Sequence, residues 1–186
     1  MQIEKTFIQD CVVIKPSVFE DERGIFFESF NDKEFKKITG IETNFVQDNQ
    51  SISKKGVLRG LHLQLGDYAQ AKLIRVIKGE IYDVAVDLRP KSATYGKYVS
   101  IVLNEENKNQ LYIPKGFAHG FIARSQETIV AYKCDNHYNK DAESGIRFDD
   151  KDLHIEWSFP NDELIISAKD KELPSLKDFH TKYGKI

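Results

Sequence analysis

The chain has 186 residues, 40% of them hydrophobic and 30% charged, and a formal net charge of −2 at pH 7. This length predicts one domain, 1–186, because a single hydrophobic core commonly serves about 100–200 residues. The near-zero charge gives no general attraction for nucleic acid or for an anionic membrane surface, so we expect neither as a partner. Any anionic ligand must therefore be bound by a local cluster of cations.

The N-terminal sequence and the cysteines indicate in which cellular compartment the protein is expected. The first residues, Met1–Lys5, have no apolar run behind a basic stretch, and no segment approaches the roughly 20 apolar residues of a membrane-spanning helix. Cys11 and Cys134 are the only two thiols and lie far apart in sequence. They are typical of small unpaired side chains in a reducing compartment, which predicts a cytoplasmic protein.

The first predicted element is a short helix, Asp32–Thr39, which has an N-cap residue before it and a glycine after it. Two β segments follow, Asn44–Ser53 and Val57–Gln64. The Lys-Lys-Gly stretch between them predicts that the two segments form a hairpin.

The next β segments are Ala71–Lys78 and Glu80–Asp87, which Gly79 separates. In the second of them, alternate residues from Ile81 to Asp87 share one face, and the residues from Tyr82 to Leu88 form a more apolar opposite face. This period of two is typical of a strand with a buried side.

The series continues to the end of the chain with further β segments and one more short helix: Tyr98–Leu103, Gln110–Ile113, Phe117–Ala123, Thr128–Cys134 and the helix Ser175–Thr181. Prolines stand where strands should end, in agreement with the loss of a ladder donor at proline. Many short strands with few helices predict an all-β fold, either a closed barrel or a jelly roll, with a few short flanking helices.

Two of the five histidines lie in predicted strands beside glycines. His62 ends the stretch RGLH, and His119 ends the stretch PKGFAH. The second spacing, P-x-G-x-x-H, is the one a cupin jelly roll uses to turn a histidine inward. Each of the two is either a satisfied core side chain or a functional group. The other histidines have polar neighbours and are interpreted as surface residues: His137, His154 and His180.

A metal site is the first functional interpretation of His62 and His119. Metal-binding cupins typically supply a His-x-His pair and a glutamate from the first motif. Here Gln64 stands two residues after His62, and no glutamate follows before Glu80. Zinc usually takes three or four protein ligands, and an amide is a poor ligand for transition metals. We therefore predict no metal and no other cofactor.

Without a metal, His62 can act as a base, because imidazole takes up a proton near neutral pH. Such a base usually has a carboxylate on its other nitrogen. Asp170 in the stretch ISAKD is the candidate, although a solvated loop charge is the alternative interpretation and spacing alone does not select it.

Anion binding requires converging cations, and Arg23, Arg59 and Lys72 all lie in or beside predicted strands. Ordinary surface charges are the alternative. Tyr132 lies on an apolar strand, where it is either a core aromatic or a proton donor.

Taken together, these stretches resemble the dTDP-4-dehydrorhamnose 3,5-epimerase family. The resemblance is collinear from about Ile3 to Leu176 and is highly specific because so many segments keep one order. The matching segments are DERGIFFESF (21–30), FVQDNQSIS (45–53), GVLRGLHLQ (56–64), QAKLIRVIKGEIYDVAVDLRPKSATYGKY (70–98), LYIPKGFAHGF (111–121), YKCDNHY (132–138), ESGIRFDD (143–150) and ISAKD (166–170).

The resemblance implies a cupin-type β jelly roll without a metal, forming a homodimer by exchange of N-terminal strands. It implies a small-molecule nucleotide-sugar substrate, dTDP-4-dehydro-6-deoxy-D-glucose, which is inverted at C3 and C5 to dTDP-4-dehydro-L-rhamnose for surface polysaccharides such as O-antigen or capsule. An epimerase that inverts C3 alone on a related sugar is the nearest alternative.

Roles for individual residues also follow from the resemblance. His62 matches the base, Asp170 its orienting partner, Lys72 the cation facing the enolate oxygen and Tyr132 the acid on the opposite face. The remaining matches are substrate-binding positions, among them an aromatic residue, Tyr138, that stacks on thymine: Arg23, Phe26, Glu28, Gln47, Asp48, Asn49, Arg59, His119, Tyr138, Glu143 and Lys169.

Two positions depart from the family pattern. Leu63 stands where an aromatic is common, and Gly66-Asp67 replaces a proline-rich pair. Both lie beside the strand of His62, where they are expected to bear on loop shape or sugar preference. Two further interpretations stay open, a sugar-nucleotide-binding cupin without catalysis and a metal-dependent cupin enzyme.

Overall fold

The computed structural model describes residues 1–184 and consists mainly of two six-stranded sheets. In the first sheet the strand order is β1 (Gln2–Lys5), β2 (Val12–Lys15), β10 (Gln110–Ile113), β7 (Lys72–Lys78), β12 (Glu127–Cys134) and β5 (Gln47–Lys54). In the second it is β13 (Glu143–Gly145), β6 (Val57–Gln64), β11 (Phe117–Ala123), β8 (Glu80–Asp87) and β9 (Tyr98–Asn104), with β14 (Ile165–Ile166) pairing with β6.

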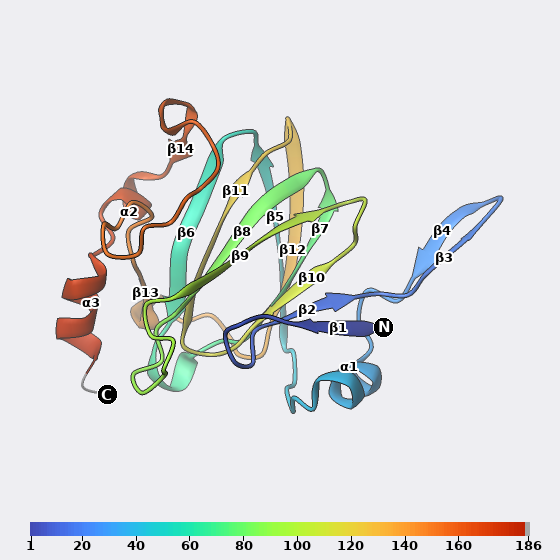
Figure 1. The fold of residues 1–186 in the computed structure, drawn as a ribbon, viewed down its shortest axis with the longest axis horizontal. Coiled ribbons are helices and arrows are strands. Elements are labelled where there is room, and N and C mark those ends of the chain that lie inside the picture. Colours follow the sequence, from blue (N-terminus) through green and yellow to red (C-terminus); the bar gives the residue numbers. More distant parts are fainter. Residues whose placement is uncertain (185–186) are drawn as a thin grey trace.

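The chain passes from one sheet to the other at several connections, as Figure 1 shows for β5 and β6, whereas β8 and β9 are neighbours in one sheet. The predicted hairpin between these two segments is therefore wrong, because β5 pairs with β12 and β6 pairs with β11. Each segment has the pattern of a strand, but a period of two does not specify the pairing partner. The prediction of a cupin-type jelly roll with a few short helices is confirmed.

The main hydrophobic core lies between the two sheets. The inward face of β8 contributes Ile81 and Ala85, and the opposite sheet contributes residues such as Ile74, Leu111 and Val130. All five are buried completely. Since apolar burial contributes roughly 25 cal/mol per Å², this core stabilises the packing of the two sheets.

The outer face of the second sheet is covered by the C-terminal part of the chain. The apolar even-numbered residues of β8 pack there against Ile146, Leu153, Trp157 and Phe179. Figure 1 shows this segment lying against β6. This cover is what brings residues after 160 next to the strand that carries His62.

The outer face of the first sheet packs on helix α1 (Asp32–Thr39) through the fully buried Phe35. The helix begins after Asn31, whose side chain accepts from the N–H of Glu34, and ends at Gly40 in the left-handed conformation. The bounds predicted from the sequence are confirmed.

Two further helices lie near the C-terminus. Helix α3 (Leu176–Tyr183) begins after its N-cap Ser175, so the predicted C-terminal helix is confirmed and extends two residues further. Helix α2 (Ala168–Lys171) has no counterpart in the prediction. Three 3₁₀ turns complete the helical elements: η1 (Gly66–Tyr68), η2 (Lys140–Ala142) and η3 (Asn161–Glu163).

A two-stranded hairpin, β3 (Val18–Asp21) and β4 (Gly24–Phe27), projects away from the two sheets (Figure 1). Its apolar side chains are exposed, Phe19 by 63% and Phe26 by 68%. Exposed apolar side chains gathered on one projecting hairpin are unusual on the surface of a single folded chain.

Both cysteines, Cys11 and Cys134, are buried and unpaired, which confirms their interpretation as free thiols. Among the helices of residues 1–184, none is long and apolar enough to cross a membrane.

Candidate active site

A cavity of about 470 Å³ opens between the two sheets. Strands β5, β7 and β12 of the first sheet and strands β6 and β11 of the second line it, together with the segment 165–170. It brings together six of the residues that the sequence singled out: Arg59, His62, Lys72, His119, Tyr132 and Asp170.

His62 and Asp170 form a direct pair. The ring Nε2 of His62 lies 2.8 Å from Oδ1 of Asp170, although 108 residues separate them in sequence. The other carboxylate oxygen accepts from the backbone N–H of Gly60 at 3.1 Å. Asp170 is only 5% exposed, so the interpretation as a solvated loop charge is wrong. It is the one buried residue of the short helix α2, which directs its carboxylate toward His62.

The environment keeps Asp170 ionised. Burial opposes its charge, but the hydrogen bonds from the His62 ring and the Gly60 N–H outweigh burial and hold the pKa of the carboxyl below its usual value. An ionised carboxylate only accepts hydrogen bonds, so Nε2 of His62 donates. The lone pair of neutral His62 is then on Nδ1, which is the nitrogen available to remove a proton.

His119 lies beside His62 because their Cα positions are partners across β11 and β6. Its Nε2 donates to Oδ1 of Asp83 at 2.6 Å, and Asp83 is completely buried on β8. The cavity therefore contains two histidines, each oriented by its own carboxylate.

Lys72 supplies an ammonium group to the same cavity. Its Nζ lies 3.5 Å from the backbone oxygen of His62. Burial of the ammonium lowers the pKa of Lys72, while the nearby Cys134, Asp83 and Glu143 act in the opposite direction. This places a cation next to the strand of the histidine base.

Tyr132 approaches the cavity from β12, in the sheet opposite to that of His62. Burial raises the pKa of its phenol, with a further rise from Cys134 and an opposing effect of Arg59, so the phenol is protonated at neutral pH. Arg59 itself donates from Nε to Oγ of Ser53 at 3.2 Å. An imidazole and a protonated phenol thus line one cavity from opposite sheets.

A second cluster lies beside the strand of His62. The phenol of Tyr138 donates to Oε2 of Glu143 at 2.8 Å, and Nζ of Lys169 donates to the same oxygen at 2.5 Å. The side chain of Gln47 accepts from the N–H of Tyr138 and donates to Asn49. Because β13 pairs with β6, this cluster of predicted binding residues borders the cavity without lining it.

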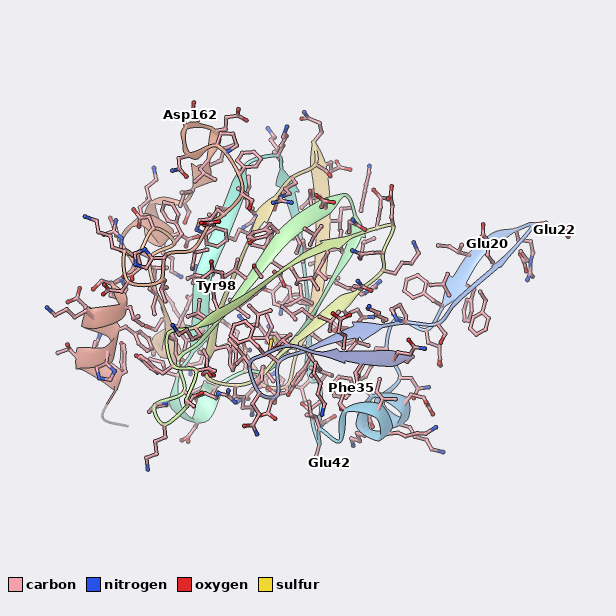
Figure 2. All side chains as sticks on the ribbon, in the orientation of Figure 1. Glu20, Glu22, Phe35, Glu42, Tyr98 and Asp162 are labelled. Atoms are coloured by element: carbon pink, nitrogen blue, oxygen red, sulfur yellow. The ribbon has the colours of Figure 1, made fainter. Side chains whose placement is uncertain are left out.

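Four predicted binding residues lie elsewhere. Arg23, Phe26 and Glu28 belong to the projecting hairpin or follow it, and the labels of Glu20 and Glu22 in Figure 2 mark how far its tip lies from the sheets. Asp48 points to the outer side of its sheet, where it pairs with Lys133 at 2.9 Å. Within one chain, none of the four reaches the cavity.

Several cavity residues were not predicted. Ser51 and Ser167 line it, and Asp83 lies behind His119. The alternation of polar residues along Gln47–Ser53 was a usable signal for Ser51, since it shares a strand face with Asn49. Leu63, the departure from the family pattern, is buried in the outer core and does not line the cavity.

In residues 1–184, no group of three or more His, Cys, Asp or Glu side chains is arranged to hold a metal ion. The chemistry that the side chains themselves can perform is proton transfer, with a histidine–carboxylate base, an ammonium and a protonated phenol. A jelly roll with such a cavity belongs to the acid–base enzymes built on the cupin fold.

Comparison with known proteins gives the family. A family model described as dTDP-4-dehydrorhamnose 3,5-epimerase matches residues 5–178. A dTDP-4-dehydrorhamnose 3,5-epimerase of Shigella flexneri is 52% identical over 91% of this chain and 93% of its own length. The chain belongs to the dTDP-4-dehydrorhamnose 3,5-epimerase family.

Solved structures agree with this assignment. The dTDP-4-dehydrorhamnose 3,5-epimerase of Elizabethkingia anophelis is 52% identical, with a TM-score of 0.93 over 96% of this chain and 97% of its own. A 3,5-epimerase of Legionella pneumophila, in complex with dTDP-4-keto-L-rhamnose, is 43% identical, with a TM-score of 0.93 over 97% of this chain and 95% of its own.

Proposed function

We propose that this protein inverts C3 and C5 of dTDP-4-dehydro-6-deoxy-D-glucose to give dTDP-4-dehydro-L-rhamnose. The observation that carries the proposal is the pair of facing groups in one cavity, the His62–Asp170 base on β6 and the protonated Tyr132 on β12. Membership of the family and the ligand named for the Legionella pneumophila relative support the choice of substrate.

Protons on C3 and C5 of the substrate flank its ketone. In the first step, Nδ1 of His62 takes such a proton, and the electron pair of the C–H bond moves onto the 4-oxygen as an enolate. The ammonium of Lys72 stabilises this oxygen, a type of contribution that is worth a few kcal/mol. The carboxylate of Asp170 stabilises the imidazolium that forms.

In the second step, the phenol of Tyr132 gives its proton to the same carbon from the other side of the sugar, and the enolate returns to the ketone. Solvent then takes the proton from the His62 imidazolium and returns one to the Tyr132 phenolate. A single group on one face would return the original configuration, so inversion requires two. Each acid or base step of this kind contributes roughly 10²–10⁴-fold to the rate.

Substrate binding is proposed for residues around the same cavity. Arg59 and His119 line it and are suited to the sugar and the phosphates, because arginine matches phosphate geometry. The cluster of Gln47, Asn49, Tyr138, Glu143 and Lys169 borders the cavity, and the exposed ring of Tyr138 is suited to stacking on thymine.

The remaining binding positions are proposed to act across a homodimer. Arg23, Phe26 and Glu28 lie on or next to the projecting hairpin, whose exposed apolar side chains fit a neighbouring subunit. Under this proposal the hairpin of one subunit completes the cavity of the other. Asp48, on the outer face of β5, would act at the same junction.

The proposal includes the whole chain as one functional domain, since its residues extend from the N-terminal hairpin to helix α2. It also includes a cytoplasmic location, which the two free thiols support.

Isotope exchange tests the proposed reaction. Incubation of the wild-type protein with dTDP-4-keto-6-deoxyglucose in heavy water is expected to place deuterium at C3 and C5, detected by NMR. His62→Asn is the control and is expected to incorporate none. Deuterium at C3 alone would support the monoepimerase alternative, and incorporation at neither carbon by the wild-type protein would overturn the proposal.

A further inference from the structure

Asp83 is a buried carboxylate that the proposed reaction does not yet use. It lies in the middle of β8 on the face that forms the main core, between Ile81 and Ala85, and its exposure is 0%. A charge in such a place costs free energy unless it is paired and hydrogen-bonded.

Within residues 1–184, only one of its two oxygens has a hydrogen-bond partner. Oδ1 accepts from His119, while Oδ2 is buried and makes no hydrogen bond. A buried carboxylate oxygen without a donor is rare in native proteins and requires an explanation.

The charges around Asp83 supply that explanation. Among the titratable groups, His119 on β11 contacts Asp83 directly, and the charge of Asp83 also acts on Lys72 of β7 and on the thiol of Cys11 before β2. Cys134 on β12 and Glu143 on β13 act on Lys72 in the same direction as Asp83. Of these groups, the two that can be cationic, His119 and Lys72, both line the cavity.

We propose that Asp83 is a positioning residue of the active site: it fixes the ring of His119 and supplies negative charge that favours the cationic form of Lys72 beside the enolate oxygen. Burial alone would favour the neutral amine, which stabilises an enolate less than an ammonium does. The unpaired Oδ2 carries part of the negative charge of the carboxylate, and this charge acts on Lys72 through space without a hydrogen bond. This role rests on the proposed function, because it is the enolate that requires the cation.

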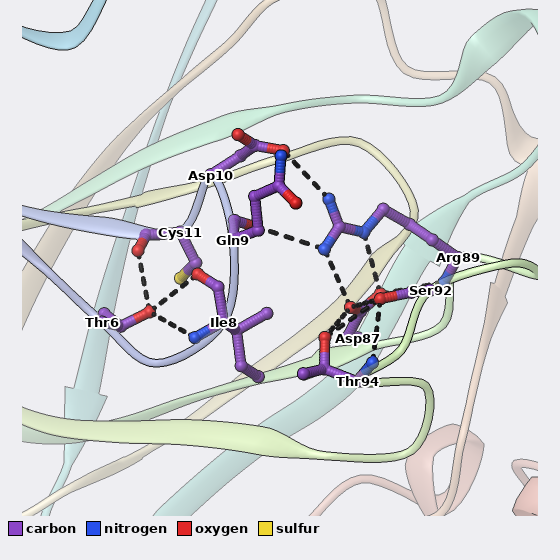
Figure 3. A network of polar contacts seen from close by, with 9 residues as sticks. All are labelled: Thr6, Ile8, Gln9, Asp10, Cys11, Asp87, Arg89, Ser92 and Thr94. Atoms are coloured by element: carbon purple, nitrogen blue, oxygen red, sulfur yellow. Dashed lines mark hydrogen bonds and ion pairs between the residues drawn. The ribbon is translucent and has the colours of Figure 1, made fainter.

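The chain offers a matched control on the same face of the same strand. Asp87 is also completely buried, four residues further along β8. Both of its oxygens are satisfied by Arg89, Ser92 and Thr94, as Figure 3 shows, and it does not line the cavity. Asp87→Asn therefore removes a buried charge from β8 without touching the active site.

The test compares Asp83→Asn with Asp87→Asn in two measurements. The first is the labelling of Lys72 by acetic anhydride, followed by mass spectrometry with the exposed Lys54 as internal reference. Only a neutral amine reacts, and loss of one nearby opposite charge is expected to raise the labelling rate of Lys72 about tenfold near pH 7.5. Asp87→Asn is expected to leave this rate unchanged.

The second measurement is the pH profile of kcat. Asp83→Asn is expected to lower kcat at least about tenfold at pH 8 and to move the alkaline limb by about one unit to lower pH, because Lys72 then keeps its proton only at lower pH. A merely structural role would leave the position of that limb unchanged. Asp83→Ser, which leaves room for water, repeats both measurements if Asp83→Asn does not fold.

Unchanged labelling and an unmoved alkaline limb in the Asp83 variants would overturn the inference, as would equal effects of Asp87→Asn. Labelling needs no substrate, so it remains decisive even if isotope exchange refutes the proposed reaction.

Discussion

In the proposed mechanism, inversion requires the phenol of Tyr132, whereas proton exchange does not. Its burial raises its pKa and so preserves the proton that it is proposed to deliver. His62 on the opposite wall can remove a proton without it. Proton removal by His62 and proton delivery by Tyr132 can therefore be measured separately.

Tyr132→Phe is expected to keep proton abstraction and to lose inversion. The base returns the proton, or a solvent deuteron, to the face from which it came, so exchange continues while epimerisation falls by about 10²–10⁴-fold. NMR of the sugar in heavy water reports both quantities. Tyr98→Phe, which removes a phenol bonded to the backbone of His154 outside the cavity, is the control and should retain both activities.

For individual residues, the local sequence was sufficient to predict most of the polar side chains that line the cavity. His62, Lys72 and Tyr132 lie on strands whose pattern is visible in the sequence, and the structure places all three in one cavity. Asp170 was a candidate only, and Asp83 was not a candidate at all. Both owe their role to a contact with a distant histidine, which local pattern does not encode.

The β3–β4 hairpin is the element whose proposed role requires a second subunit. Phe19 and Phe26 on this hairpin are exposed and belong to none of the hydrophobic clusters of the chain. The fold of a single chain therefore gives these two side chains no packing partner in its core. If the hairpin completes a neighbouring cavity, residues on it act in trans and residues of the cavity act in cis.

Complementation tests this arrangement. Co-expression of differently tagged Arg23→Ala and His62→Asn chains is expected to give mixed dimers with one intact cavity of two, and hence about a quarter of wild-type activity under random assembly. Arg59→Ala with His62→Asn is the matched control. Each of these substitutions damages the cavity of the subunit that carries it, so each mixed dimer has two damaged cavities. Equal activity of the two combinations would exclude the exchange.

The extent of each strand could be predicted, whereas its partner could not. The segments Gln110–Ile113 and Phe117–Ala123 coincide with β10 and β11. The predicted hairpin at 54–56 failed because the chain there passes from one sheet to the other. A short turn permits either course, and the choice depends on which faces the rest of the chain buries.

For the whole molecule, groups whose pKa differs between the folded and unfolded states make the free energy of unfolding depend on pH. The carboxyl groups of Asp87, Asp170 and Glu143 have lowered pKa values, because hydrogen bonds to each outweigh its burial. Their contribution is present above the unfolded value of about 4 and is lost as the pH falls further. The buried thiol of Cys11, beside Thr6 in Figure 3, acts at the other end, since burial raises its pKa to about 12.

The sign for Cys11 follows from linkage. Below pH 9 the thiol is neutral in both states; between pH 9 and about 12 only the unfolded state loses the proton, so stability falls as the pH rises. When the pH is raised from 8 to 10.5, the free energy of unfolding of Cys11→Ala is therefore expected to fall by about 1–2 kcal/mol less than that of the wild type. Urea denaturation at the two pH values measures this difference.

Ile8→Val is the control for this experiment, because Ile8 is a buried neighbour without a titrating group. It should cost about 1 kcal/mol equally at both pH values. A Cys11→Ala protein with the alkaline slope of the wild type would contradict the assignment.

The sequence by itself determined what is local in this protein: the alternation that makes strands, the capped helix at 32–39 and the collinear segments that mark the family. Only the tertiary structure decided which strands pair and which carboxylates reach the two histidines. The physical reason is that the jelly roll joins segments such as 62 and 170, which are 108 residues apart, through the packing of whole sheets. That packing depends on all the apolar faces together, and no single stretch of sequence contains it.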